Sequence, residues 1–477
     1  MTYRRLPAVL LAAALTPLAL ALTAPSAHAA TAAKPYDFNG DGRLDLAIGA
    51  PGATVGGKAK AGAVSVVYAS SGGLKTSTRT LITQNTAGVP GAAESDDAFG
   101  TAVASADLNT DGYADLLIGA PGEDVNGDTN DGTVVTVWGS KSGLSGARSV
   151  PNPLDADLDR YGQSLTVGDV EYDGDLDIVV GSTGPVGLTF INGPFTRTSS
   201  FQGGSGSGFY DTHSTSYGIT PVSLGHVSAS SDTNLVVHGR RLGTDDAVTH
   251  LVTDPSIGNY TDWWQELPSG YVSALGDIDK DGHADIAIGN ERETSADPAG
   301  AKGGKVTVVY GGPAGVDPSR TPLVLTQDTA GIPGASESGD RFGSGVSLGD
   351  VNGDGYADLA VGASGENSGA GSVTVLYGSA SGLRTTGVQS FTQNTAGVPG
   401  TSEPNDRFGA RVLLADHSGD RRAELTVSAT GENGDGAVWS LRGAASGVTT
   451  GGAASFGPGT TGVSTAGSPG YGTALNS

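Results

Sequence analysis

The sequence predicts an all-β fold, a seven-bladed β-propeller of four-stranded blades. Two observations support this prediction. A nine-residue acidic loop motif recurs seven times along the 477 residues, and short apolar strands follow each copy. Self-similarity of this kind is typical of repeat architectures, and four short strands per repeat is the propeller pattern. No stretch shows the apolar period of an amphipathic helix, which favours an all-β chain.

The loop motif is clearest at 107–115, DLNTDGYAD, where an apolar strand follows directly. Side-chain oxygens stand at loop positions 1, 3, 5 and 9, and position 6 is glycine. Alternating oxygen ligands around a tight glycine bend are the pattern of a Ca²⁺ loop. The copies begin at residues 37, 107, 169, 226, 277, 350 and 416. Two are degenerate: the copy at 226–234 has lost nearly all its acidic positions, and the copy at 416–424 has Arg421 in place of glycine.

Each repeat follows one order. An aromatic-glycine pair such as Phe99-Gly100 opens a strand, the acidic loop follows, and three further strands come before the next pair. The first repeat lacks its opening pair, but residues 471–475, YGTAL, resemble residues 99–103, FGTAV. We therefore expect residues 471–475 to supply the missing strand of blade 1 and close the ring, which removes an open sheet edge. The alternative is a frayed C-terminal tail.

Composition and the N-terminal sequence indicate an extracellular protein. Residues 1–29 have the basic start, apolar centre and small-residue cleavage site of a signal peptide, and residues 30–477 are expected to form a single propeller. The general and twin-arginine export routes stay open. We expect a secreted monomer without a membrane anchor, because no later segment has 18 consecutive apolar residues. The formal charge of −24 argues against nucleic-acid partners, and the absence of cysteine excludes disulfides and thiolate chemistry.

Phe99-Gly100, the 107–115 loop and Gly119-Ala120-Pro121 resemble the FG-GAP repeats of the integrin α-chain propeller and of related secreted bacterial proteins. The resemblance covers nearly all of residues 36–475. It implies that each loop binds Ca²⁺ between the first two strands of a blade, and that ligands meet the opposite face. The implied sites comprise Asp37, Asn39, Asp41, the Arg43 carbonyl and Asp45; Asp107, Asn109, Asp111, the Tyr113 carbonyl and Asp115; Asp169, Glu171, Asp173, the Asp175 carbonyl and Asp177; Asp277, Asp279, Asp281, the His283 carbonyl and Asp285; and Asp350, Asn352, Asp354, the Tyr356 carbonyl and Asp358.

A sixth Ca²⁺ site in the degenerate seventh copy stays open, and its ligands would be Asp416, Ser418, Asp420 and Glu424. No metal is expected at 226–234. The alternative for every loop is an Asx-rich turn that only caps strand ends. The recurrence of five aligned copies favours a metal site over a simple turn. Repulsion also favours it, because three or four close carboxylates repel one another without a cation.

No catalytic constellation is recognisable, so we expect a protein that is not an enzyme. GVSLG at 345–349 matches a nucleophile-elbow pattern but is not followed by a helix. Two features could bind a partner. One is the loop at 84–100, repeated at 327–343 and 393–409, for which sealing of neighbouring blades is the alternative role. The other is an aromatic cluster at Tyr260, Trp263, Trp264 and Tyr271, for which packing against a neighbouring blade is the alternative.

The expected function is an extracellular binding or adhesion scaffold for a protein or glycan. The first alternative is a secreted hydrolase with its site at the mouth of the central channel. The second is a structural component without a discrete ligand site. The sequence leaves the ligand and the binding face open, because one fold can carry many functions.

Overall fold

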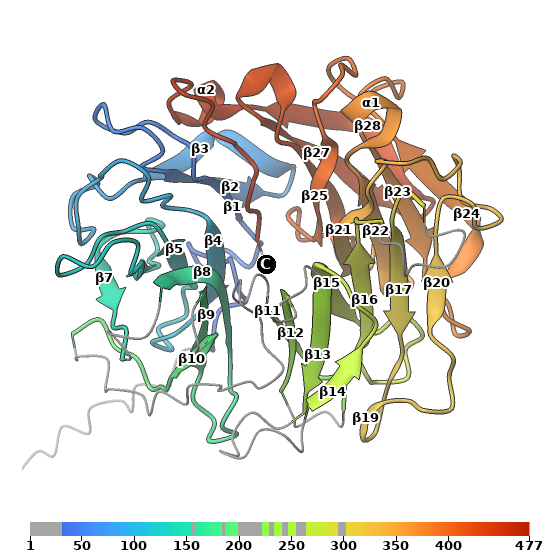
Figure 1. Cartoon of the computed structure of the whole chain (residues 1–477), viewed down its shortest axis with the longest axis horizontal. Coiled ribbons are helices and arrows are strands. Elements are labelled where there is room, and N and C mark those ends of the chain that lie inside the picture. Colours follow the sequence, from blue (N-terminus) through green and yellow to red (C-terminus); the bar gives the residue numbers. More distant parts are fainter. Residues whose placement is uncertain are drawn as a thin grey trace, which may run out of the picture.

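The structure, a computed structural model, describes residues 31–153, 159–183, 187–198, 222–228, 233–240, 247–253, 264–293 and 302–476. Seven antiparallel sheets surround a central axis, and the C-terminus lies near the middle of the ring (Figure 1). The predicted all-β, seven-bladed propeller is confirmed. The predicted signal peptide, Tyr260 and Trp263 lie outside the described residues, as does the side chain of Trp264.

Within a blade the strands run in chain order from the axis outward. Blades 1 to 3 contain β1 (Leu46–Ala50), β2 (Ala63–Ser70) and β3 (Gly73–Ile82); β4 (Ala102–Ala106), β5 (Asp115–Ala120), β6 (Thr133–Val137) and β7 (Ala147–Val150); and β8 (Asp159–Gly168), β9 (Asp177–Thr183) and β10 (Leu188–Ile191). Blades 4 and 5 contain β11 (Val222–Gly225), β12 (Asn234–Arg240), β13 (Ala247–Val252) and β14 (Trp264–Leu267); and β15 (Val272–Gly276), β16 (Asp285–Asn290), β17 (Lys305–Val309) and β20 (Leu323–Leu325).

Blades 6 and 7 contain β21 (Phe342–Gly349), β22 (Asp358–Ala363), β23 (Ser372–Tyr377) and β24 (Arg384–Phe391); and β25 (Phe408–Ala415), β26 (Glu424–Ala429), β27 (Ala437–Ala444) and β28 (Gly447–Phe456). The remaining elements are small: the hairpin β18 (Gly311–Gly312) and β19 (Gly315–Val316), and the short helices α1 (Glu366–Gly369), η2 (Glu432–Gly434) and α2 (Pro458–Thr461).

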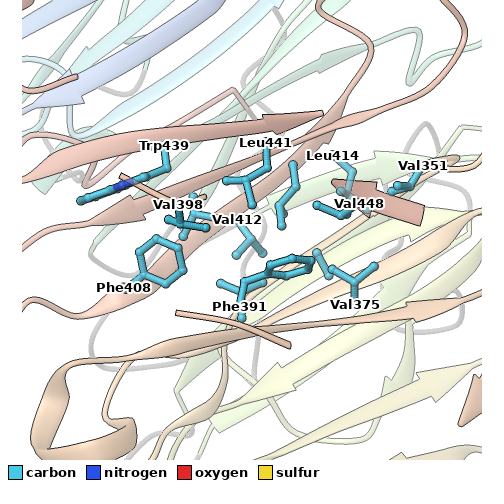
Figure 2. Packing of buried hydrophobic residues seen from close by; sticks show 14 of the residues in the cluster. Val351, Val375, Phe391, Val398, Phe408, Val412, Leu414, Trp439, Leu441 and Val448 are labelled. Carbon is cyan, nitrogen blue, oxygen red and sulfur yellow. The ribbon is translucent and has the colours of Figure 1, made fainter. Parts of the chain in front are cut away.

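Burial explains the sequence pattern of the strands. The second strand of a blade is covered on both faces by its neighbours, so β5 and β22 are buried at every position and consist of continuous short apolar runs. The outermost strand faces solvent on one side, so β24 mixes exposed and half-buried residues. The core therefore lies between blades. In Figure 2, Phe408 and Trp439 pack edge to face at the interface of blades 6 and 7, with ring centroids 5.3 Å apart.

The glycine of the Gly-Ala-Pro motif, at the end of the second strand, permits close approach between neighbouring blades. A Cβ atom on Gly119 would lie 2.0 Å from the carbonyl oxygen of Gly162, the glycine of the aromatic-glycine pair in the next blade. Gly362 stands in the same relation to Gly409, at 1.9 Å. No side chain fits at that distance, so the spacing of the blades requires glycine here.

The C-terminus closes the ring, as predicted. The Gly472 amide donates to the Gly49 carbonyl at 3.0 Å, just as the Gly100 amide donates to Gly119 at 2.9 Å. Closure is less extensive than a full strand, because residues 471–475 contribute one bridge, Gly49 to Ala474, to the three strands of blade 1. Blade 3 also has three strands in its described part, where the sequence predicted four.

Candidate metal loops and the central channel

The acidic loops share one internal hydrogen-bond pattern. The first aspartate of each accepts the backbone amide of position 5 with one carboxylate oxygen and that of position 6 with the other. In the second loop, Asp107 accepts from Asp111 at 3.0 Å and from Gly112 at 2.9 Å. Equivalent pairs of bonds are made by Asp37, Asp169, Asp277, Asp350 and Asp416. The aspartate at position 5 accepts from the amide of position 7, as from Arg43, Tyr113, Asp175, His283 and Tyr356.

The ninth residue joins its loop to the blade. Asp115 is fully buried, and its two oxygens accept the Leu108 amide at 3.0 Å and the Gly139 amide, just beyond β6, at 2.9 Å. Equivalent bonds are made by Asp45, Asp177, Asp285 and Asp358. Burial raises the pKa of Asp45, Asp115, Asp285 and Asp358 to about 7 and that of Asp177 to about 6. These carboxylates are therefore costly to ionise without a cation.

The loop residues fit a hard cation. The Asn109 Oδ1 atom, at position 3, is buried and has no hydrogen-bond partner in the described part of the chain. In the fifth loop, carboxylate oxygens of Asp277, Asp279 and Asp285 lie within 4.8 Å of one another. Oxygen donors of this kind are what Ca²⁺ prefers. Of the other predicted donors, Asn39 and Asn352 at position 3 each accept the position-5 amide of their loop. Glu171 stands at the same loop position in the third copy, with a longer side chain.

Two arginines from neighbouring segments also reach the loops. Arg197 Nη2 lies 2.8 Å from Asp111 Oδ2, and Arg320 forms a salt bridge with Asp279. Arg197 follows β10 of blade 3, the blade after the one that contains its loop. Arg320 lies between β19 and β20 of blade 5, the blade that contains its own loop. They offset part of the acidic charge, and they compete for the same carboxylates as a bound cation would.

The two degenerate loops keep the fold by different means. Arg421 adopts a left-handed φ of 70° where the five intact loops have glycine. Glu424 is one carbon longer than the usual aspartate, and its Oε2 atom accepts both the His417 and Ser418 amides, at 2.7 and 3.1 Å. In the fourth loop, the uncharged Asn234 accepts the Ser228 amide at 2.8 Å and donates to Thr253. An amide can thus replace the buried carboxylate where no cation is expected.

Successive loops are also bonded to one another. The amide of position 8 donates to the carbonyl oxygen of position 1 in the preceding loop, as Ala114 does to Asp37 at 3.0 Å. The same bond joins Ala284 to His226, Ala357 to Asp277, and Ala423 to Asp350. Among the described residues, this bond therefore joins the first loop to the second, and the fourth to the seventh in succession, on one face of the propeller.

The long loops at 84–100, 327–343 and 393–409 join neighbouring blades, which supports sealing of blades, the alternative to partner binding. Each begins with a buried glutamine whose amide nitrogen donates to a glutamate of the next blade. The pairs are Gln84 with Glu123, Gln327 with Glu366, and Gln393 with Glu432. Burial raises the pKa of Glu123 to about 7, and it also raises the pKa of Glu366 and Glu432. The sequence analysis missed these pairs, although all three have the same separation in the chain.

A central channel runs along the axis. It encloses about 400 Å³ and is lined by residues from all seven blades. Arg411 is the one charged side chain among the described residues that line it. Its wall also includes Tyr271, from the predicted aromatic cluster, whose ring has the Arg292 guanidinium 4.9 Å from its centre. The elbow-like serine, Ser347, accepts the Leu414 amide at 2.9 Å within the packed strands, so it has a structural role.

A polar pocket of about 430 Å³ lies on the face opposite the acidic loops. Its lining includes Glu337, Asp340, Arg341, Asn405 and Arg407, which belong to the long loops. Strand connectivity places these loops opposite the acidic ones, because the chain reverses direction at each antiparallel step. Among the described residues, no helix is long and apolar enough to cross a membrane.

Comparison with known proteins agrees with the repeat structure. The family model for the FG-GAP repeat matches residues 29–67, 99–137, 269–309 and 342–376. Curated relatives include phosphatidylinositol-glycan-specific phospholipase D of Bos taurus, 36% identical over 149 residues, which are 31% of this chain and 17% of that protein. The Rattus norvegicus protein of the same name is 32% identical over 203 residues, 41% of this chain and 23% of its own length. The Homo sapiens protein is 35% identical over 164 residues, covering 34% and 19%. The matched part is thus less than a quarter of the length of these relatives.

Proposed function

Because the chain carries FG-GAP repeats on a seven-bladed propeller, we propose that it is a secreted, calcium-stabilised scaffold that binds an extracellular protein or glycan. The observation that supports this most is the repetition of one hydrogen-bonded acidic loop in six blades on one face of the ring. A device repeated so often serves the ring as a whole. Catalysis would need one distinct site.

Calcium in these loops would supply positive charge to carboxylates that otherwise repel each other. The residues of the chain do the rest. The first aspartate of a loop orders the turn, as Asp107 does, and the ninth ties it to the third strand, as Asp115 does through Gly139. Since the loops are also bonded to one another, ordering one loop restrains the next. The cation thereby stabilises the arrangement of the blades.

The face opposite the acidic loops is the proposed binding surface. The pocket at Asp340 and Arg407 combines anionic, cationic and amide groups in about 430 Å³. Such a lining suits hydrogen bonding to a polar ligand, and glycan hydroxyl groups can both donate and accept. The two long loops that line it are each hydrogen-bonded to the next blade through Gln327 and Gln393, which reduces the entropy cost of binding.

A glycan and matrix-protein array tests this proposal. The protein is applied with calcium and again with a chelator, as wild type and as the double variant Arg341→Ala, Arg407→Ala. Arg384→Ala, an exposed change on the outer strand β24, is the matched control. We expect calcium-dependent binding that the double variant weakens at least tenfold and that Arg384→Ala retains. A blank array, or binding that neither chelator nor double variant changes, contradicts it.

A second candidate is a secreted hydrolase with its site at the channel. Similarity to proteins named phospholipase D favours this class, although the matched part is a small share of those proteins. Ser273, which lines the channel, also favours it, because its hydroxyl lies 2.8 Å from Nε2 of the buried His238. If the protein binds on the array and shows no hydrolytic activity at the channel, the scaffold function alone is supported.

A further inference from the structure

One layer of the channel wall departs from the repeat in a single blade. Each blade contributes one side chain to this layer of the channel wall. In blades 2 to 7 this residue stands four positions before the acidic loop, and in blade 1 it comes from the C-terminal segment. Six blades present an apolar residue there: Leu475, Val103, Leu165, Val222, Val346 and Val412. Blade 5 presents Ser273, paired in register with Ile288 as Val103 is with Ile118. The repeat therefore places one hydroxyl in an otherwise apolar layer.

A second departure lies directly beside the first. The second strand of blade 4 has His238 at the register where blades 1, 2, 3, 5 and 6 have the glycine of the Gly-Ala-Pro motif. In most blades that glycine packs against the glycine carbonyl of the next blade, as Gly119 does against Gly162. Here the imidazole occupies the space, and its Nδ1 atom lies 3.1 Å from the Gly270 carbonyl oxygen. Its Nε2 atom lies 2.8 Å from Ser273 Oγ.

The partners of the imidazole determine which nitrogen carries the proton. The Gly270 carbonyl can only accept, which favours the tautomer with the proton on Nδ1, and in that tautomer Nε2 accepts from the Ser273 hydroxyl. Thr249 Oγ1 lies 3.1 Å from the same Nδ1 atom, accepts the Gly270 amide at 3.0 Å and donates to the Gly270 carbonyl oxygen at 3.4 Å in this arrangement. A hydroxyl aimed at the lone pair of a fixed imidazole is the arrangement of a nucleophile and its general base.

The surroundings suit this role. His238 is fully buried, while Ser273 is half-buried and faces the channel. Burial lowers the pKa of His238 to about 4, with His250 as the nearby titratable group, so the imidazole is neutral at pH 7 and its Nε2 lone pair is available to the Ser273 hydroxyl. Ser223 Oγ, from blade 4, lies 3.1 Å from Ser273 Oγ and lines the same cavity.

We propose that Ser273 is a nucleophile activated by His238, acting on short acyl esters that enter the central channel. Ser273 Oγ forms a bond to the ester carbonyl carbon while its proton passes to Nε2. The bond to the alcohol then breaks, and the alcohol leaves with that proton. Water, deprotonated by Nε2, attacks the acyl-serine and releases the carboxylic acid, and the proton returns to Ser273 Oγ. The cavity, about 400 Å³, is of a size that holds a small ligand.

A reagent that reacts with activated serines tests the assignment without knowledge of the substrate. An alkyl fluorophosphonate would bond to Ser273 Oγ through phosphorus and release fluoride, and mass spectrometry of peptides would locate the label. Ser273→Val introduces the residue found at this register in four other blades, so it is expected to fold and to lose the label. Ser164→Ala, a change at another serine of the channel wall, is the matched control and should react within about threefold of wild type. His238→Gln should slow labelling by about a hundredfold.

Several outcomes would overturn the proposal. They are a label on another serine, equal labelling of the Ser273→Val variant, and no label on a protein whose melting curve shows it to be folded. Hydrolysis of p-nitrophenyl acetate adds a pH profile. The rate should stay flat between pH 5.5 and 8 because His238 is buried, and a fall centred near pH 6.5 would indicate an exposed histidine instead. This inference names a nucleophile for the hydrolase alternative. Labelling reports on the channel and arrays report on the opposite face, so the two can fail separately.

Discussion

The backbone amide of Gly472 donates a hydrogen bond to the carbonyl oxygen of Gly49 at 3.0 Å, although the two residues lie near opposite ends of the chain. Beside this bond, Tyr471 is fully buried between blades 7 and 1. Its place is that of Phe99, Phe342 and Phe408 in other blades. The ring is therefore closed by the same contacts that join its internal blades.

The first prediction concerns this closure. Tyr471→Ala removes a fully buried aromatic ring, so it should lower the free energy of unfolding by about 3–5 kcal/mol, measured by urea denaturation. Tyr471→Phe is the matched control and should change it by less than about 1 kcal/mol, because phenylalanine fills the equivalent place elsewhere. Equal stability of the alanine variant and wild type would show that the C-terminal segment is not docked.

The second prediction concerns calcium. A chelator should lower the melting temperature by several degrees, because each site held at a hundredfold excess of ligand over its Kd contributes about 2.7 kcal/mol. Asn109→Ala removes the unpartnered oxygen of the second loop and should reduce the calcium stoichiometry by one in titration calorimetry. A melting temperature that is the same with calcium and with chelator would leave the loops as metal-free turns.

The third prediction concerns the seventh loop. Arg421 adopts φ 70°, a conformation that costs a side chain about 1 kcal/mol relative to glycine. Arg421→Gly should therefore raise the free energy of unfolding by about that amount. The reverse change, Gly355→Arg in the sixth loop, should lower it by a similar amount, because the Lys280 Nζ atom that a Cβ would meet at 2.5 Å ends a flexible side chain that can move aside. Both are read from urea midpoints. An Arg421→Gly protein less stable than wild type would show that the arginine side chain stabilises the loop.

The fourth prediction concerns the glutamate of an inter-blade pair. Burial raises the pKa of Glu123 from 4.5 to about 7, so the folded protein holds a proton that the unfolded chain releases. This stabilising contribution is complete below pH 4.5 and is lost as the pH rises through about 7. Glu123→Gln should remove the dependence and make the protein more stable than wild type at pH 8, by on the order of 1 kcal/mol.

Urea denaturation at pH 5 and pH 8 measures this difference. Asp128→Asn, a change at an exposed carboxylate, should leave the pH dependence of wild type unaltered. A Glu123→Gln variant that loses as much stability as wild type between the two pH values would place the titrating group elsewhere.

The sequence was sufficient for the fold and for most of the acidic loops because both are local. Asp107 and Asp115 lie within one nine-residue loop, and burial on both faces of β5 produces a readable apolar run. Ring closure was also predictable, since residues 471–475 repeat the pattern of residues 99–103. The single bridge that joins the C-terminus to β1 could not be foreseen, because its extent depends on packing.

The features that were missed depend on contacts between blades. Gln84 and Glu123 stand in different repeats, and neither departs from an ordinary polar pattern. His238 and Ser273 also belong to different blades, and each looks unremarkable within its own strand. Aligning the repeats in register would have given a signal, because His238 then replaces a glycine and Ser273 replaces an apolar residue.

Ring closure by residues 471–475 has a consequence for synthesis. The strands of blade 1 are made before those of the other six blades, yet Gly49 finds its partner only after Ala474 has been added. During translation the hydrogen-bonding groups on the inner edge of β1 therefore stay unpaired until the other six blades have been synthesised. The earliest blade to be synthesised is among the last to be completed, and the newborn chain must be kept from pairing that edge with another molecule.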